Sequence, residues 1–170
     1  TLGLVPPDNL RDHIRKAVEV AGARRIGHGV DVMYEDKPFQ LLERMKDKKV
    51  LVEICLTSND AILGVKGKQH PFPEYLKAGV PVTLASDDEG VSRIDLTHEY
   101  QRATQDYGLD YSALKVLARN SIHYSFLTGG SLWTDSSYRQ MQACGDGDFP
   151  VARDACQRFL NTHDKARVEW

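Results

Sequence analysis

Two adjacent aspartates, Asp87 and Asp88, stand in the stretch TLASDDEGVSR, where an apolar segment gives way to a polar loop. Two earlier predicted strands also end in polar residues, the first at His28 between two glycines and the second at Thr57, Ser58 and Asn59. Zinc takes imidazole nitrogen and carboxylate oxygen as ligands, and it activates water for attack on a substrate. A second carboxylate nearby can hydrogen-bond the substrate or carry a proton. These residue types therefore suit the chemistry of a metal-activated water.

Each of these residues also has a purely structural explanation. A histidine between glycines is usually part of a turn, and adjacent aspartates often cap a helix or lie solvated in a loop. Ser58 and Asn59 could cap a short turn. One histidine and one aspartate are also too few for catalytic zinc, which takes at least three ligands from the protein. Further ligands must therefore come from elsewhere.

The elements that would position these residues alternate along the chain. Three strands are predicted: a short one in RRIGHGVD that ends in a Gly-rich turn, and two in the mostly apolar runs VLVEICLTSN and VPVTLASDD. Apolar residues at helical spacing predict helices over 8–21, 37–47, 72–79, 95–107, 110–126 and 151–163. This alternation predicts an α/β fold with a parallel sheet, in which all strand C-termini meet on one side. Three such strands would leave both sheet edges open, so we expect more strands to belong with them.

Composition narrows the classes of partner. The chain has 170 residues, 41% of them hydrophobic and 27% charged, with a net charge of -2, which suits one globular domain. That charge supplies no basic field, and no apolar run approaches the roughly 20 residues of a membrane span, so we expect neither nucleic acid nor membrane as a partner. The start at TLGLVPPDN, without Met, suggests a processed product, a trimmed piece or one segment of a longer protein.

The three cysteines have different interpretations. Cys55 lies in the apolar run VLVEICL and is predicted to be a buried, inert thiol. Cys144 and Cys156 flank a loop-like stretch that leads into a helix, and they could close a small disulfide loop. The alternative is two unpaired thiols in a cytosolic protein. We expect the disulfide, and with it a periplasmic or secreted location ahead of a cytoplasmic one.

Four ordered segments resemble a known family. RRIGHG, EICLTSN, HPFPEYLKAGVPVTLASDDEG and RNSIHYSFL are similar to motifs of the adenosine deaminases in the metal-dependent amidohydrolase superfamily, and the resemblance covers residues 8–127. SDDEGVSR, GGSLW and the last, cysteine-containing helix resemble a bacterial branch with exported members. The resemblance implies a (β/α)8 TIM barrel, of which 1–127 would be the C-terminal part with strands six to eight. Residues 128–170 would then be a loop and helix extension of the same domain.

The resemblance also implies roles for individual residues. Asp87 is similar to the family's zinc-ligating aspartate, and Asp88 to the aspartate that hydrogen-bonds the purine ring. His28 matches the histidine that orients or deprotonates the attacking water. Supporting roles are implied for Glu53, Ser58 and Asn59. Arg25 and Glu53, on neighbouring strands, could pair beneath the site, although a structural or surface ion pair explains them equally well.

Several family motifs are absent from this chain. The two early zinc histidines, the third zinc histidine and the glutamate that protonates the purine ring do not occur, and Glu89 stands where the family often has proline. The chain's other histidines do not lie in sequence contexts in which they could replace these missing zinc ligands: His13, His70, His98, His123 and His163. We therefore expect Zn2+ to take its remaining ligands from the N-terminal part of the same barrel, present as a separate segment or chain. The chain by itself is expected to be inactive.

The expected activity of the complete protein is hydrolytic, zinc-dependent deamination of adenosine, or a close purine analogue, to inosine and ammonia. Two alternatives stay open. One is an adenine or aminopurine deaminase, because Asp88 would bind the base in either substrate. The other is a catalytically degenerate protein that binds or senses a nucleoside.

Overall fold

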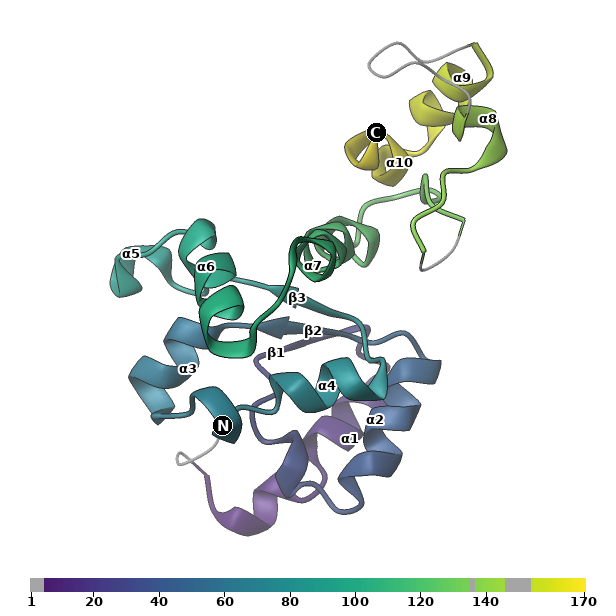
Figure 1. Cartoon of the computed structure of the whole chain (residues 1–170). Coiled ribbons are helices and arrows are strands. Elements are labelled where there is room, and N and C mark those ends of the chain that lie inside the picture. The colour runs from purple at the N-terminus through teal and green to yellow at the C-terminus, as the bar shows by residue number, and fades with distance from the viewer. Residues whose placement is uncertain (1–4, 135–136, 146–153) are drawn as a thin grey trace. The chain divides into compact units, whose positions relative to one another are not determined.

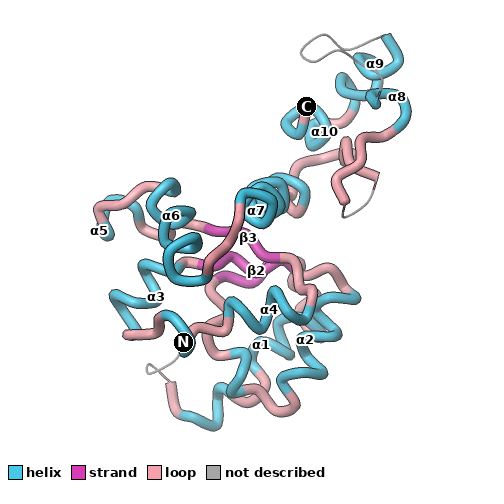
Figure 2. The backbone as a smooth tube through the Cα atoms, in the orientation of Figure 1, coloured by secondary structure: helices cyan, strands magenta, loops and turns pink. Residues whose placement is uncertain are grey.

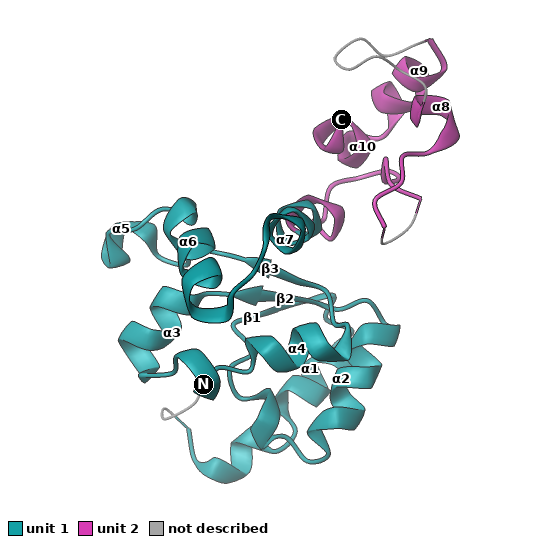
Figure 3. Cartoon of the chain, in the orientation of Figure 1, with its two compact units in different colours: residues 1–120 teal, residues 121–170 magenta. Residues whose placement is uncertain are grey.

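Two compact units make up the chain, residues 1–120 and residues 121–170 (Figure 3). The computed structural model describes residues 5–134, 137–145 and 154–170. The first unit holds the sheet and all the residues predicted to do chemistry. The second unit holds the two cysteines predicted to form a disulfide.

A small parallel sheet lies at the centre of the first unit. Its strands follow in the order β1 (Arg25–Gly27), β2 (Leu51–Ile54) and β3 (Val82–Leu84). Arg25 lies opposite Leu51, and Val52 lies opposite Val82, so the three strands run side by side in the same direction. The predicted parallel sheet is confirmed, and its strands end along one common edge.

Helices surround this sheet and connect its strands (Figures 1 and 2). In chain order they are α1 (His13–Glu19), α2 (Pro38–Asp47), α3 (Leu56–Leu63), α4 (Phe72–Ala78), α5 (Glu89–Ser92), α6 (Leu96–Tyr107) and α7 (Tyr111–His123). Single 3₁₀ turns cover Pro7–Leu10, Val32–Tyr34 and Gly67–Gln69. None of the helices in the described part of the chain is both long and apolar enough to cross a membrane.

The core forms where α1, α2 and α4 pack together on one side of the sheet (Figure 1). Leu41 and Met45 of α2 and Tyr75 of α4 are completely buried there, as is Val52 at the centre of β2. Removing this much apolar surface from water stabilises the unit by about 25 cal/mol per Å² buried. The core therefore holds the strands, and with them the strand ends, in fixed positions.

Two predicted elements are shorter than expected. The helix predicted over 8–21 is divided, because α1 begins only at His13, after a separate 3₁₀ turn. The side chain of Glu35 explains this start, since its Oε1 accepts hydrogen bonds from the backbone nitrogens of Ile14 at 2.6 Å and Arg15 at 3.4 Å. Burial raises the pKa of the Glu35 carboxyl, and those two backbone hydrogen bonds act in the opposite direction.

The strand predicted in VLVEICLTSN ends at Ile54, and Leu56 begins α3. The prediction that this strand ends in Ser58 and Asn59 is therefore wrong in detail, because both residues lie in α3. The apolar run continues through the bend at Cys55, so the sequence shows no break there. Helix α5 was also not predicted from the sequence.

The second unit is a small helical unit with its own core. Its helices are α8 (Gln142–Gly145), α9 (Asp154–Thr162) and α10 (Asp164–Glu169). Leu132, Leu160 and Ala166 are buried around a disulfide between Cys144 and Cys156, whose sulfurs are 2.03 Å apart. The predicted helix over 151–163 begins among residues 146–153, which lie outside the described residues, and its described part is α9.

Candidate active site at the strand ends

His28 follows β1 in a tight turn. Its backbone has φ 62°, in the left-handed region, and its backbone nitrogen donates a hydrogen bond to the backbone carbonyl oxygen of Glu53 at 2.9 Å. The next residue, Gly29, has φ 59°, and its carbonyl accepts a hydrogen bond from the Tyr75 hydroxyl at 2.8 Å. A non-glycine residue in this region costs roughly 1–2 kcal/mol, so the surrounding contacts must hold the turn.

Gly29→Ala is expected to destabilise the protein by about 3 kcal/mol, combining backbone strain with overpacking. A Cβ at Gly29 would lie 2.5 Å from the Tyr75 hydroxyl oxygen and 3.0 Å from Val52 Cγ1. Gly64→Ala is the matched control, because Gly64 also has a positive φ of 68° but nothing lies within 4 Å of its Cβ position. Urea denaturation should show the larger loss for Gly29→Ala. Equal losses in the two variants would contradict this account of the turn.

Asp87 lies in the loop after β3, which ends at Leu84. It too has a left-handed backbone, with φ 58°, and its side chain is 29% exposed. The Ser58 hydroxyl donates a hydrogen bond to Asp87 Oδ2 at 2.6 Å, and His28 Nε2 lies 3.7 Å from the same oxygen. The second distance is too long for a hydrogen bond and leaves the two groups facing each other. Residues from three distant segments thus converge at one edge of the sheet.

Asn59 connects His28 to the interior. It is 2% exposed, and its Oδ1 is 2.9 Å from His28 Nδ1. Its Nδ2 is 2.8 Å from Nε2 of His70, which is also 2% exposed. His70 precedes Pro71 in a loop, and no pattern in the sequence connects it with the site. A signal for it could have been the HPFPEYL stretch, which places a histidine just before the buried start of α4.

Glu99 is a second residue that the sequence did not single out. This α6 carboxylate is completely buried, and it accepts hydrogen bonds from the backbone nitrogens of Leu56 at 2.7 Å and Thr57 at 3.1 Å. Both nitrogens belong to the first turn of α3, where backbone N–H groups lack partners within the helix and the helix dipole favours a negative charge. Glu99 thereby fixes the helix that carries Ser58 and Asn59.

Glu99→Gln is expected to reduce the free energy of unfolding by about 2 kcal/mol, because charge-assisted hydrogen bonds become neutral ones and an amide N–H faces backbone donors. Thermal denaturation of the variant would measure this loss. Glu43→Gln, on the exposed face of α2, removes the same charge without a buried partner and should stay near the wild type. A Glu99→Gln protein as stable as Glu43→Gln would contradict the capping role.

Asp88 lies at the N-cap position of α5 and is exposed. The sequence left open whether its carboxylate simply caps a helix. Within residues 88–92, all of which are described, that carboxylate makes no capping hydrogen bond. The backbone oxygen of Asp88 instead accepts hydrogen bonds from the backbone nitrogens of Val91 at 3.1 Å and Ser92 at 2.9 Å. The Asp88 side chain therefore remains available to another molecule.

Glu53 and Cys55 complete the surroundings of the site. Arg25 Nε donates to Glu53 Oε1 at 2.7 Å, which forms the ion pair that the sequence allowed for. Cys55 is buried, and its sulfur belongs to a group with His28 and Asp87 whose ligand atoms all lie within 4.8 Å of one another. Burial, followed by the charges of Asp87, Glu99 and Glu53, raises the pKa of the Cys55 thiol to about 12.

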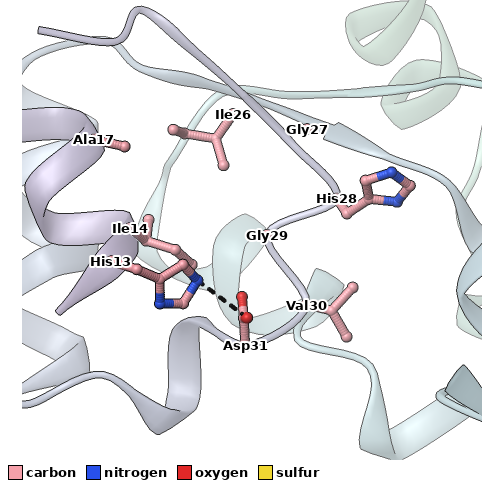
Figure 4. Close-up of a pocket in the computed structure, with 9 residues that line it drawn as sticks. All are labelled: His13, Ile14, Ala17, Ile26, Gly27, His28, Gly29, Val30 and Asp31. Carbon is pink, nitrogen blue, oxygen red and sulfur yellow. Dashed lines mark ion pairs between the residues drawn. The ribbon is translucent and has the colours of Figure 1, made fainter. Parts of the chain in front are cut away.

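A pocket of about 210 Å³ lies between α1 and residues 26–31. His13 and Asp31 form an ion pair at its wall, with His13 Nε2 3.1 Å from Asp31 Oδ2. Figure 4 shows the ring of His28 pointing away from this pair. His13 is therefore not part of the cluster formed by His28, Ser58 and Asp87.

Comparison with known proteins gives a consistent result. The family model described as adenosine deaminase matches residues 10–131. An adenosine deaminase of Shewanella loihica is 37% identical over 114 residues, which is 66% of this chain and 34% of that protein. An aminodeoxyfutalosine deaminase of Streptomyces coelicolor is 41% identical over 106 residues, covering 62% of this chain and 27% of that protein. The chain thus spans about a third of the length of the curated relatives it matches.

Solved structures show the same relationship. An adenine deaminase from Arthrobacter aurescens matches 74% of this chain and 36% of its own, with a TM-score of 0.61 and 27% sequence identity. An N6-methyl-AMP deaminase from Arabidopsis thaliana matches 74% of this chain and 34% of its own, with a TM-score of 0.59 and 29% identity. The three parallel strands and their helices therefore correspond to the C-terminal part of a (β/α)8 barrel.

Proposed function

The chain belongs to the adenosine deaminase family, and from this premise we propose that the complete protein deaminates adenosine, or a close purine analogue, to inosine and ammonia with the help of zinc. One observation carries the proposal. His28, Ser58 and Asp87 come from three distant segments and meet at the carboxyl ends of the strands. The Ser58 hydroxyl donates a hydrogen bond to Asp87 Oδ2 at 2.6 Å, and His28 Nε2 lies 3.7 Å from the same oxygen. Active sites of parallel α/β barrels form at this edge.

The donor groups at this edge fit zinc. Asp87 presents a carboxylate oxygen, which is a usual zinc ligand, and the His28 ring lies beside it within one small cluster. Asp87 would hold the metal, and its Oδ2 is already oriented by the Ser58 hydroxyl, as metal-ligating carboxylates commonly are. When bound, zinc supplies a Lewis acid that makes water nucleophilic at neutral pH. Catalytic zinc usually has three protein ligands, so residues other than Asp87 must complete the site.

The chain's own residues divide the remaining tasks. His28, held by its turn and by Asn59, would orient the attacking water with its Nε2, which faces Asp87. Asp88, exposed and without a capping hydrogen bond, would bind the nitrogen edge of the purine ring and help to transfer a proton. Glu53, Ser58 and Asn59 would support these groups, together with Glu99 through α3.

The remaining strands of the barrel are proposed to come from another segment or chain. Among the described residues, β1 and β3 each pair only with β2, so each has a second edge open to a further strand. Ile26 and Gly27 of β1 line the pocket beside α1 (Figure 4). Strands placed at these edges would close the barrel and could bring the zinc ligands and the acid that this chain lacks. By itself the chain is expected to be inactive.

The substrate class rests on a comparison of relatives that act on different purines. Their printed names include adenosine, adenine, aminodeoxyfutalosine and N6-methyl-AMP deaminases. An aspartate such as Asp88 would recognise the base that these compounds share, whereas contacts to the sugar would lie largely outside this chain. Adenosine is the leading candidate because adenosine deaminases of Shewanella and Clostridium are among the similar relatives.

The experiment that tests this proposal is a substrate panel on the complete protein with zinc. Adenosine, adenine, aminodeoxyfutalosine and N6-methyl-AMP would each be incubated with it, and both the deaminated product and the released ammonia or amine would be measured. We expect turnover of adenosine above the others. Preferred turnover of adenine would support the aminopurine alternative. Tight binding of adenosine without any product would contradict the enzymatic function and support a nucleoside-binding protein instead.

A periplasmic or secreted location is also proposed. The disulfide between Cys144 and Cys156 lies in the buried core of the second unit, and such bonds persist mainly in oxidising compartments. Titration of free thiols in the denatured, unreduced chain should find only Cys55.

A further inference from the structure

Two buried polar side chains, His70 and Asn59, lead to His28 from the loop before α4. His70 Nε2 lies 2.8 Å from the Asn59 amide, and that amide lies 2.9 Å from His28 Nδ1. At the far end, the backbone nitrogen of Phe72 donates to His70 Nδ1 at 3.0 Å. These contacts therefore begin at a backbone group of α4 and end at the ring that faces Asp87.

The backbone of Phe72 fixes where His70 carries its proton. A backbone N–H can only donate, so His70 Nδ1 must be the acceptor in this contact. Burial, followed by the charge of Arg102, lowers the pKa of His70 to about 4, so its ring is neutral near pH 7. A neutral imidazole has one N–H, and in His70 it is on Nε2.

This proton determines the orientation of the Asn59 amide. With Nδ2 of Asn59 towards His70 Nε2, two donors would face each other in a buried place. Rotating the amide by half a turn exchanges its oxygen and nitrogen, which are nearly equal in size, and keeps both contacts. The oxygen then accepts from His70, and the amide N–H donates to His28 Nδ1. All three groups are satisfied only in this arrangement, and buried polar groups are rarely left unpaired.

We propose that His70 is a positioning residue that, through Asn59, fixes His28 as the tautomer with its proton on Nε2 and directs that N–H towards the side where Asp87 lies. The inference rests on the proposed function, because it selects between two roles given there to His28. In this tautomer the neutral ring has no free lone pair on Nε2. His28 therefore holds the attacking water and its developing negative charge by donating a hydrogen bond, and another group removes the proton.

Two substitutions at His70 separate positioning from local structure. In the complete protein, His70→Gln places an amide N–H near the former Nε2, so it keeps a donor to Asn59 but loses the acceptor for Phe72. His70→Asn places an oxygen near the former Nδ1, so it keeps the acceptor for Phe72 but loses contact with Asn59. We expect His70→Gln to retain a kcat near the wild type. His70→Asn should lower kcat about 10–100-fold, with KM and zinc content unchanged.

The opposite order of the two variants, or equal losses in both, would overturn the proposal. A second measurement does not depend on activity or on the variants folding. Nitrogen NMR of the wild-type complete protein with ¹⁵N-labelled histidine, assigned with His28→Gln and His70→Gln, should show the Nε2–H tautomer at both positions. A proton on Nδ1 of His28 would refute the inference. If the complete protein shows no deaminase activity, the proposed function fails, but the NMR measurement of the His28 tautomer still tests the positioning role of His70.

Discussion

Asp87→Ala is expected to abolish both zinc binding and deaminase activity in the complete protein. Asp87 is held by the Ser58 hydroxyl at the end of β3, with His28 facing it, and it is the carboxylate in the one group of possible metal ligands found among the described residues. Removing a ligand from a site with few ligands leaves the metal weakly held, and the water then loses its activation. Zinc per protein, measured by atomic emission after gel filtration, should fall far below one.

Ser58→Ala is the graded control for Asp87→Ala. It removes the 2.6 Å hydrogen bond to Asp87 Oδ2 but leaves the carboxylate in place. Loss of such an orienting partner typically weakens metal binding or activity about 10–100-fold, so excess zinc should largely restore the variant. Asp87→Ala should not be restored at the same zinc concentration. An Asp87→Ala protein that keeps stoichiometric zinc and normal turnover would remove Asp87 from the metal site.

Asp88→Ala is expected to keep zinc but lower turnover by about 10²–10⁴-fold, the usual range for a group that handles a proton. The neighbouring carboxylates thus give opposite results for metal content. The structural reason is that Asp87 contacts Ser58 and faces His28, whereas Asp88 is exposed at the start of α5 with no capping hydrogen bond within residues 88–92, all described. Steady-state kinetics with adenosine, together with zinc analysis of the same sample, would measure both quantities.

Glu89→Gln is the matched control for Asp88→Ala. Glu89 is the next residue, is also exposed, and carries the same charge at the first position of α5. Its replacement should leave both zinc and turnover near the wild type. If Asp88→Ala and Glu89→Gln had the same small effect, the loop would matter only through its charge. Loss of zinc from Asp88→Ala would instead show that the two aspartates act together on the metal.

The convergence of the site could be predicted from the sequence because it depends on topology alone. Parallel strands end on one side of a sheet, so predicted strands that finish in His28 and Asp87 are enough to predict that these residues approach each other. The structure places His28 Nε2 3.7 Å from Asp87 Oδ2. The family was likewise recognisable from ordered motifs, and the match over residues 10–131 confirms it.

What the sequence did not reveal depends on contacts between distant residues. Helix α3 begins inside an apolar run because Glu99, 43 residues beyond Leu56, accepts the hydrogen bonds of its first turn. Helix α1 begins late because Glu35, 21 residues beyond Ile14, does the same there. Local propensity cannot register such partners. The connection of His70 with the site was not predicted for the same reason, since it reaches His28 through Asn59, 11 residues before His70.

Metal removal from the complete protein tests the central claim most directly, namely that these strand ends belong to a zinc-dependent deaminase. The protein would be treated with a chelator, desalted, and assayed for conversion of adenosine to inosine while zinc is added back in known amounts. We predict that activity disappears on chelation and returns in proportion to zinc, reaching its full value at one ion per site. Adenosine deamination that is unaffected by complete removal of metal would contradict the account.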